Sequence, residues 1–236
     1  MKKTISYILG LLLFPTLIFA QYSASDASSG ITFSSSNIMQ NLNPTDVKGT
    51  PYYGDEIKEG RVYLPNEKKT EVLELVINLE ENLLLFKEDD VYKIFNPAII
   101  KGIEIYDDYR QPEDFFVIGF SSPENDIMTT SFLRVVYNGD IKMLAHHSVE
   151  YDRGNFRDPI TNRVTSEYKK KETYYIVRED GGFVKTRLRL KDILKDIGEY
   201  EKELKDFAKK NKIKGKSETD AFKILEYYDS LKKENS

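Results

Sequence analysis

The spacing of the apolar residues changes near Lys191, and this change constrains the fold more than any other feature of the sequence. In the preceding run, Phe183–Leu190, apolar and basic residues alternate, which is typical of a strand with one buried face. After it, the apolar residues fall on one side of a short helix, which is lined by Leu190, Ile193, Leu194 and Ile197. Because strands come first and helices last, we expect an α+β protein.

Short strands separated by turn residues are indicated between Tyr52 and Tyr151. The first five are expected at Arg61–Leu64, Glu71–Ile77, Asn82–Lys87, Val91–Phe95 and Ile99–Tyr106. Strands that follow one another this closely favour antiparallel neighbours. The expected architecture is therefore an antiparallel β-meander curled into a sandwich or partial barrel, followed by two or three C-terminal helices.

A hairpin is predicted around Asn138-Gly139, because both residues tolerate the positive φ angles of a type I′ turn. Its arms are Thr130–Tyr137 and Ile141–Tyr151. One face of the second arm is expected to be buried and carries Ile141, Met143, Ala145, His147 and Val149. His146 is expected on the solvent side.

A long surface loop is predicted at Asp152–Lys171, which is polar and contains Gly154, Pro159 and three consecutive lysines. A last hairpin should follow, with arms at Tyr174–Arg178 and Phe183–Leu190 around a glycine turn.

Three helices are expected after this hairpin. Gly198 ends the first, and the second, Glu199–Asn211, is expected to bury Leu204, Phe207 and Ala208. The third begins at Ser217, which together with Asp220 resembles a capping box. Its apolar stripe consists of Ala221, Phe222, Leu225, Tyr228 and Leu231. None of these helices is stable alone, so they must dock on the sheet or on one another.

The amino terminus has the plan of an export signal. Lys2 and Lys3 precede the apolar run Ile5–Phe19, and cleavage is expected between Ala20 and Gln21. The run is shorter than the roughly 20 residues that span a bilayer, which favours a cleaved signal over an anchor. We expect an exported protein that is periplasmic or extracellular and surface-associated, with no integral membrane span after cleavage.

Four segments follow from these patterns. They are a signal peptide at 1–20, a flexible leader at 21–51, an antiparallel β domain at 52–190 and a helical segment at 191–232 packed on the sheet. The leader is rich in Ser, Asn, Asp and Gly and contains one candidate strand at Ile31–Phe33.

Charge and cysteine content argue against several functions. The formal charge of −4 becomes −6 when Lys2 and Lys3 are removed with the signal. Nucleic-acid binding is therefore not expected, since it depends on clustered positive charge. The sequence has no cysteine, so a disulfide and a lipid-modified cysteine are excluded. With only two histidines besides, a zinc site built on the usual ligand sets is not expected.

No motif for catalysis, a metal ion or a cofactor stands out. His146 and His147 are the only histidines, and as neighbours in a strand they point to opposite faces and cannot chelate one ion through both rings without a bulge. The acidic runs Glu88-Asp89-Asp90 and Asp107-Asp108 lack the spaced loop of a calcium site and are interpreted as solvated turns. Neither a G-x-S-x-G elbow nor a Gly-rich phosphate loop is present. We expect a protein that is not an enzyme.

One surface is a candidate site for an anionic glycan or a lipid headgroup. It is a basic stripe formed by Lys185, Arg187, Arg189 and Lys191. Carboxylates nearby, such as Glu179 and Asp192, favour the alternative of a mixed solvated surface.

Three short runs toward the C terminus carry a resemblance. They are Tyr174-Tyr175-Ile176, Lys212-Ile213-Lys214 and Glu226-Tyr227-Tyr228-Asp229-Ser230-Leu231. Together they resemble a recurrent group of uncharacterised exported bacterial proteins, in which a β-rich body precedes a "YY" strand, a Lys-rich helical pair and an EYYNSL-like tail. The similarity extends over Gly60–Leu231, and Asp229 stands where Asn is usual. It implies a shared fold and export, but no activity and no site residue.

Three functional hypotheses follow. The first is an exported, non-catalytic binding or structural module of the cell envelope, whose partner is an envelope or surface protein. The alternative is a carrier of a small apolar ligand within the curled sheet, which requires a continuous apolar cavity. The third is an envelope hydrolase, which requires two Asp or Glu side chains facing each other across a cleft.

Overall fold

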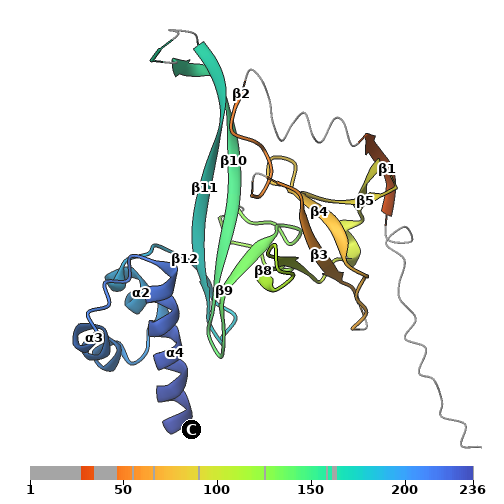
Figure 1. The fold of residues 1–236 in the computed structure, drawn as a ribbon. Coiled ribbons are helices and arrows are strands. Elements are labelled where there is room, and N and C mark those ends of the chain that lie inside the picture. The colour runs from red at the N-terminus through yellow and green to blue at the C-terminus, as the bar shows by residue number, and fades with distance from the viewer. Residues whose placement is uncertain are drawn as a thin grey trace, which may run out of the picture.

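The computed structural model describes residues 28–34, 47–54, 56–65, 67–89, 91–124, 126–157, 159–160 and 164–235. The residues expected to form a signal peptide (1–20) and most of those expected to form a flexible leader (21–51) lie outside these residues. The described part has the expected α+β fold, in which one curled, mainly antiparallel sheet is followed by three helices (Figure 1).

Twelve strands within the described residues form a single sheet. They are β1 (Ser28–Ser34), β2 (Val47–Lys48), β3 (Lys58–Tyr63), β4 (Leu73–Asn78), β5 (Leu83–Glu88), β6 (Val91–Phe95), β7 (Gly102–Tyr106), β8 (Pro112–Val117), β9 (Leu133–Asn138), β10 (Lys142–Arg157), β11 (Val164–Val177) and β12 (Phe183–Thr186). Their spatial order is β1-β6-β5-β4-β3-β7-β8-β9-β10-β11-β12, and β2 lies beside β11. From β3 onward the strands form the expected meander with one exception: the chain leaves β6 through a 3-10 turn and pairs β7 with β3.

The five strands expected first are confirmed as β3 to β7, with ends that shift by a few residues. The candidate strand at Ile31–Phe33 is confirmed within β1, which pairs with β6. Strand β8 is not among the predicted strands. It begins with Pro112-Glu113-Asp114, so the alternation of apolar and polar residues that reveals a strand is absent from its first half.

We call the curled part of the sheet, strands β3 to β8, the body. Apolar side chains fill its inside. Phe86, Phe95 and Phe116 are fully buried, and the ring centroids of Phe86 and Phe95 lie 4.5 Å apart. The cluster also contains Val62, Leu64, Leu75, Ile77, Leu84, Ile100, Ile103, Ile105 and Phe132. Each buried ring removes a large apolar area from water, so the aromatic residues supply much of the stability of this cysteine-free chain.

The hairpin between β9 and β10 is confirmed, but its turn is not of type I′. Asn138 pairs with Lys142, so the loop is residues 139–141, and neither Asn138 nor Gly139 has a positive φ angle. A Cβ atom on Gly139 would lie 1.7 Å from Asp229 Oδ2. Glycine is needed here because the C-terminal helix approaches the turn closely.

The prediction of a surface loop at Asp152–Lys171 is wrong. These residues continue β10 and begin β11, so arms of 16 and 14 residues form one long hairpin that projects past the body (Figure 1). The ladder extends from Lys142–Val177 to Arg157–Val164, with an irregularity after Asp152. Along its outer half both arms are largely polar, so the sequence lacks the apolar alternation of a half-buried strand.

The segment 47–54 connects this long hairpin to the body. Its first two residues, β2, pair in parallel with β11, and Lys170 Nζ donates a hydrogen bond to Gly54 O (3.0 Å). Tyr52 is buried against the outer face of β4, β5 and β6. The segment therefore contacts the hairpin on one side and the body on the other.

The helical end consists of α2 (Leu190–Ile197), α3 (Glu201–Lys210) and α4 (Glu218–Glu234), and these confirm the three expected helices. Gly198, with a φ of 83°, ends α2, and Ser217 Oγ accepts a hydrogen bond from Asp220 N (3.1 Å) at the start of α4. The Asp220 carboxylate accepts hydrogen bonds from the backbone of Lys214 and Lys216, so the capping box is modified. Within the described residues, no helix combines the length and the apolar character needed to cross a membrane.

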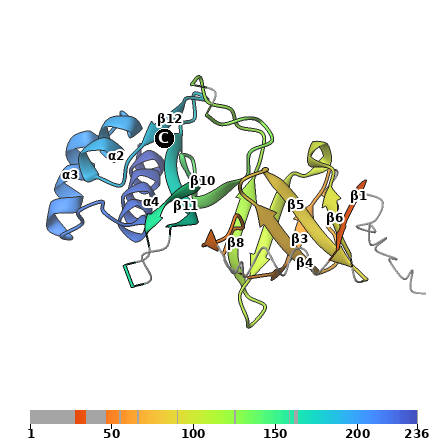
Figure 2. The same cartoon turned by 90° about the horizontal axis from the view of Figure 1, so that it is seen from above.

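The helices pack against the β9–β12 end of the sheet, and the body lies at the other end (Figure 2). Their shared core contains Tyr137, Ile141, Met143, Ile176, Ile193, Leu194, Ile197, Leu204, Ala208, Ile213, Ala221, Ile224, Leu225, Tyr228 and Leu231. Phe222, expected in the apolar stripe of α4, is 43% exposed, and Ile224 is buried instead.

Both faces of β10 are buried at its beginning. Met143 is buried, as predicted, and contacts the helical core, whereas Leu144 on the opposite face packs with Tyr175 under Ile127 of the loop between β8 and β9. The expectation that this opposite face meets water throughout is therefore wrong here, because a long loop covers it.

Candidate functional site

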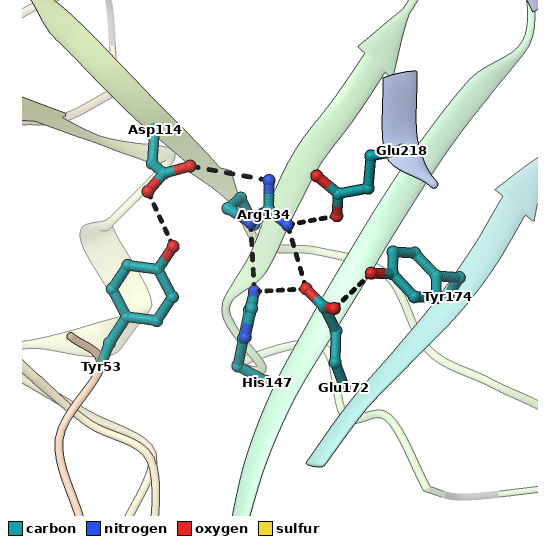
Figure 3. Close-up of polar contacts among 7 residues, drawn as sticks. All are labelled: Tyr53, Asp114, Arg134, His147, Glu172, Tyr174 and Glu218. Atoms are coloured by element: carbon teal, nitrogen blue, oxygen red, sulfur yellow. Dashed lines mark hydrogen bonds and ion pairs between the residues drawn. The ribbon is translucent and has the colours of Figure 1, made fainter. Parts of the chain in front are cut away.

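Arg134 lies where the body, the long hairpin and the helical end meet (Figure 3). It is the one charged residue of β9, and its side chain is 13% exposed. Its Nε donates a hydrogen bond to His147 Nε2 (3.1 Å), and a terminal nitrogen donates to Glu172 Oε1 (3.0 Å). The same nitrogen donates to Glu218, and the other terminal nitrogen lies 3.6 Å from Asp114 Oδ1. One guanidinium thus connects β8, β10, β11 and α4.

Two tyrosines complete this group. The Tyr53 hydroxyl donates a hydrogen bond to Asp114 Oδ2 (2.7 Å), and the Tyr174 hydroxyl donates to Glu172 Oε2. Burial, followed by the neighbouring carboxylate, raises the pKa of both phenols, so both remain protonated donors. We call the whole group the Arg134 cluster; it consists of Tyr53, Asp114, Arg134, His147, Glu172, Tyr174 and Glu218.

His147 is neutral within the Arg134 cluster. Burial lowers its pKa, although Glu172 opposes this shift, and Nε2 serves as the acceptor for Arg134. Glu172 Oε1 lies 3.2 Å from the same nitrogen, a contact that becomes a hydrogen bond only when the imidazole is protonated. His147 lies on the predicted face of β10, but in a polar cluster and not in the apolar core. His146, expected in solvent, is half-buried.

The charges of the Arg134 cluster do not cancel. Burial opposes the charge of Arg134, but the hydrogen bond and attraction of Glu218, with Glu172 and Tyr53, raise its pKa overall. Three carboxylates surround this single cation. Both oxygens of Asp114 and both oxygens of Glu172 face a donor or a cation. The polar atoms of the Arg134 cluster thus bond to one another. A cluster of this kind can hold elements of the fold together or present a charged surface.

Three hollows in the described part of the surface meet at the Arg134 cluster. The hairpin hollow, of about 450 Å³, lies between the body and the long hairpin. The helix hollow, of about 690 Å³, lies between the hairpin and α2 and shares Lys171 and Glu172 with the first. The fork hollow, of about 440 Å³, lies between β8, β9 and α4 and shares Glu113 and Asp114 with the first.

The hairpin hollow has walls of opposite charge. Its body wall carries Glu56, Glu113 and Asp114 with one cation, Lys58, whereas its hairpin wall carries Lys170 and Lys171 with one carboxylate, Glu172. Tyr53 and His147 lie between the walls, with their rings edge to face at a centroid distance of 4.9 Å. A lining of this kind suits a charged polar ligand or a protein surface more than an apolar molecule.

The four residues of the predicted basic stripe occupy different elements. Lys185 lies in β12, Arg187 and Arg189 lie in the following bend, and Lys191 lies in α2, all exposed as expected. Lys185 and Arg187 line the helix hollow. Two of the four are paired, Lys185 with Asp126 (2.7 Å) and Arg189 with Asp192 (2.6 Å). An anionic ligand at these residues stays a prediction.

The acidic turns have local roles. Asp107 Oδ1 accepts hydrogen bonds from Tyr109 N and Gln111 N, and Glu88 pairs with Lys93. Asp90 lies outside the described residues. Among those that the structure describes, no three His, Asp or Glu side chains come close enough together to hold a metal ion.

The sequence alone located His147 and Tyr174 of the Arg134 cluster in predicted strands, but it linked neither of them to the other members. The others are separated along the chain from Tyr53 to Glu218, and only the folded sheet brings them together. One signal was present: Arg134 interrupts the apolar run Phe132–Tyr137. A charged residue in a strand with buried neighbours is normally paired, so its position predicts a partner although not which one.

Comparisons of this chain with models of known protein families, with curated proteins and with solved structures find no match.

Proposed function

We propose that this chain is an exported, non-catalytic binding module of the cell envelope that recognises an envelope or surface protein. The observation that carries the proposal is the meeting of three charged hollows at the Arg134 cluster. A partner seated there would contact the body, the long hairpin and the helical end at once. The lining combines aromatic side chains with charged ones, as at the border between the aromatic-rich core of a protein–protein interface and its polar rim.

The interior of the body gives little support to a carrier of apolar ligands. Phe86, Phe95 and Phe116 occupy it, and the three hollows are lined mainly by charged and polar residues. A carrier requires a continuous apolar cavity, which would have to replace this packing.

The proposal is tested by photo-crosslinking in the cells that produce the protein. A photoreactive amino acid replaces Lys171, which lines both the hairpin and helix hollows, or Thr219, which lines the fork hollow. The matched control replaces Glu203, an exposed residue of α3 that lines none of the three. Purification and mass spectrometry then identify the attached molecules.

We expect one dominant envelope protein attached at a hollow position and absent from the control. A chain that attaches no protein from either hollow position, or that carries only a small molecule, contradicts the proposal. Export is checked in the same cells by sequencing the amino terminus, which should begin at Gln21. A protein that retains Met1 in the cytoplasmic fraction contradicts export.

A hydrolase is the second candidate, because Asp114 and Glu172 line opposite walls of the hairpin hollow. Two carboxylates across a cleft are the minimum for hydrolysis of a glycosidic bond. Release of reducing ends from purified cell-wall glycan, lost in both Asp114→Asn and Glu172→Gln, would establish this activity. If the unchanged protein releases none, this second candidate is removed.

A further inference from the structure

Strands β8 and β9 separate at one end of their ladder. They pair only at Phe116–Arg134 and Val117–Leu133. Beyond these pairs β8 stays with β7 in the body, whereas β9 runs beside β10 toward the helices (Figure 1). The edges at 113–115 and 135–137 are therefore not paired with each other, and the sheet forks.

The fork hollow fills the opening between these strands, and α4 forms its third wall. Glu218, Phe222 and Glu226 are spaced four residues apart, so they lie along one side of α4 and line the hollow together. Phe222 is 43% exposed, and its ring lies nearly perpendicular to that of Tyr137 at a centroid distance of 5.1 Å. An exposed aromatic ring between two carboxylates thus lies beside the open edge of β9.

The fork hollow is acidic. Its carboxylates are Glu113, Asp114, Glu218 and Glu226, and its cations are Arg134 and Lys223. Arg134 is already bound by three carboxylates, and Glu113 has Lys58 at 3.7 Å. Glu226 is exposed and has no ion-pair partner among the described residues. A cationic side chain entering the hollow would find this carboxylate one helical turn from Phe222, whose face can hold its charge or its aliphatic stem.

From this juxtaposition we infer that the fork hollow docks an extended segment of a protein partner that carries Lys or Arg at alternate positions. The segment pairs its backbone with the open edge of β9 at Val135 and Val136, the part of that edge that lines the hollow, as peptides do when they add a strand to a sheet. Alternate side chains of an added strand share one face, so basic residues two apart reach the acidic wall of α4 together. This inference rests on the proposed function and specifies which part of the partner is bound.

The test uses the purified mature chain and two synthetic peptides of about eight residues, one alternating Lys with Thr and the other alternating Glu with Thr. Binding is measured by fluorescence anisotropy near physiological ionic strength, where long-range attraction between exposed charges is largely screened. Glu226→Lys reverses the charge in the hollow. Glu203→Lys makes the same change on the exposed side of α3 and is the matched control. Thermal unfolding shows whether both variants are folded.

We expect the Lys peptide to bind the unchanged chain and Glu203→Lys alike, and to bind Glu226→Lys at least tenfold more weakly. The Glu peptide should not bind. Absence of binding to the unchanged chain, or equal binding to both variants, overturns the inference.

Strand addition is tested separately from charge. Methylation of alternate backbone amides of the Lys peptide keeps every charge but removes one edge of hydrogen-bond donors. We expect one of the two possible methylation patterns to abolish binding, because only one edge of the peptide pairs with β9. Full binding by both methylated peptides would show that the segment does not add a strand.

Failure of this inference differs from failure of the proposed function. An envelope protein that crosslinks at Lys171 and not at Thr219, together with no binding of the Lys peptide, retains the binding module and rejects the fork as its docking site.

Discussion

At Gly139 the chain passes so close to α4 that a methyl group would lie 1.7 Å from Asp229 Oδ2. That oxygen accepts hydrogen bonds from the Tyr137 hydroxyl (2.6 Å) and from Asp140 N (3.2 Å). We expect Gly139→Ala to displace the carboxylate and to lower the free energy of unfolding by roughly 2–4 kcal/mol. Urea unfolding measures the change.

The partner residue supplies the control for this prediction. Asp229→Ala alone leaves the buried Tyr137 hydroxyl without its acceptor and should cost about 1–3 kcal/mol. Because both substitutions break the same contact, their costs should not add in the double variant. Fully additive costs would show that Gly139 is needed for a reason other than the approach of Asp229.

His147 makes stability depend on pH close to neutrality. Burial lowers its pKa below 6.5 in the folded state, whereas the unfolded chain keeps the ordinary value. The folded state therefore binds fewer protons, so this stabilisation is fully present above pH 6.5 and is lost as the pH falls through 6.5 toward the folded pKa. Urea unfolding on the two sides of this range should show the lower stability on the acid side.

His147→Gln retains an acceptor for Arg134 but does not titrate, so the pH dependence should become shallower. Burial lowers the pKa of His146 as well, so some dependence remains until both histidines are replaced. An unchanged dependence in His147→Gln would mean that His147 has the same proton affinity in the folded and unfolded states.

At the scale of elements, the start of α4 depends on two side chains that precede its second turn. Ser217 Oγ accepts from Asp220 N, and the Asp220 carboxylate accepts from Lys214 N (3.1 Å) and Lys216 N (3.2 Å). We expect Ser217→Ala to lower the free energy of unfolding by about 1 kcal/mol. Thr219→Ala, at an exposed position of the same turn, should change it by less than about 0.5 kcal/mol. Equal effects would contradict a capping role.

The elements with periodic apolar residues were predictable, and those without them were not. The alternation in Val91–Phe95 and the helical spacing in Leu190–Ile197 located β6 and α2 because each buries one side. The outer half of the β10–β11 hairpin contains few apolar side chains, so its sequence predicts a loop. Phe222 has helical spacing with the core residues of α4, and only the packing shows that it lies at the margin of the buried side.

Arg134 connects the body, the long hairpin and the helical end, which would otherwise have unpaired charges at their junction. Arg134→Met keeps much of the side-chain volume but leaves three carboxylates without their shared cation. We expect it to lower the free energy of unfolding by about 3 kcal/mol. Arg110→Met, which breaks the exposed pair with Glu59, is the control and should change the free energy of unfolding far less than Arg134→Met, because solvent screens an exposed pair. A similar small loss in both variants would contradict a central role for Arg134.

The Arg134 cluster could not be predicted from the sequence, because its contacts depend on how the sheet curls. Asp114 belongs to a strand with a weak pattern, and Glu172 belongs to residues that read as a loop. The curl brings β8 to β9, and the helical end brings Glu218 to the same point. The spacing of apolar residues along the chain contains no information on which distant residues come into contact.

The close approach of Asp229 to the β9–β10 turn also joins two parts of the chain that are synthesised at different times. The Tyr137 hydroxyl and the Asp229 carboxylate are 92 positions apart, and bringing together residues so distant in the chain is slow. The face of β10 that carries Met143 stays uncovered until the helices have been synthesised and have docked. This end of the sheet therefore completes its packing only after α4 is available, so a chain whose α4 has not yet been made keeps this apolar face exposed.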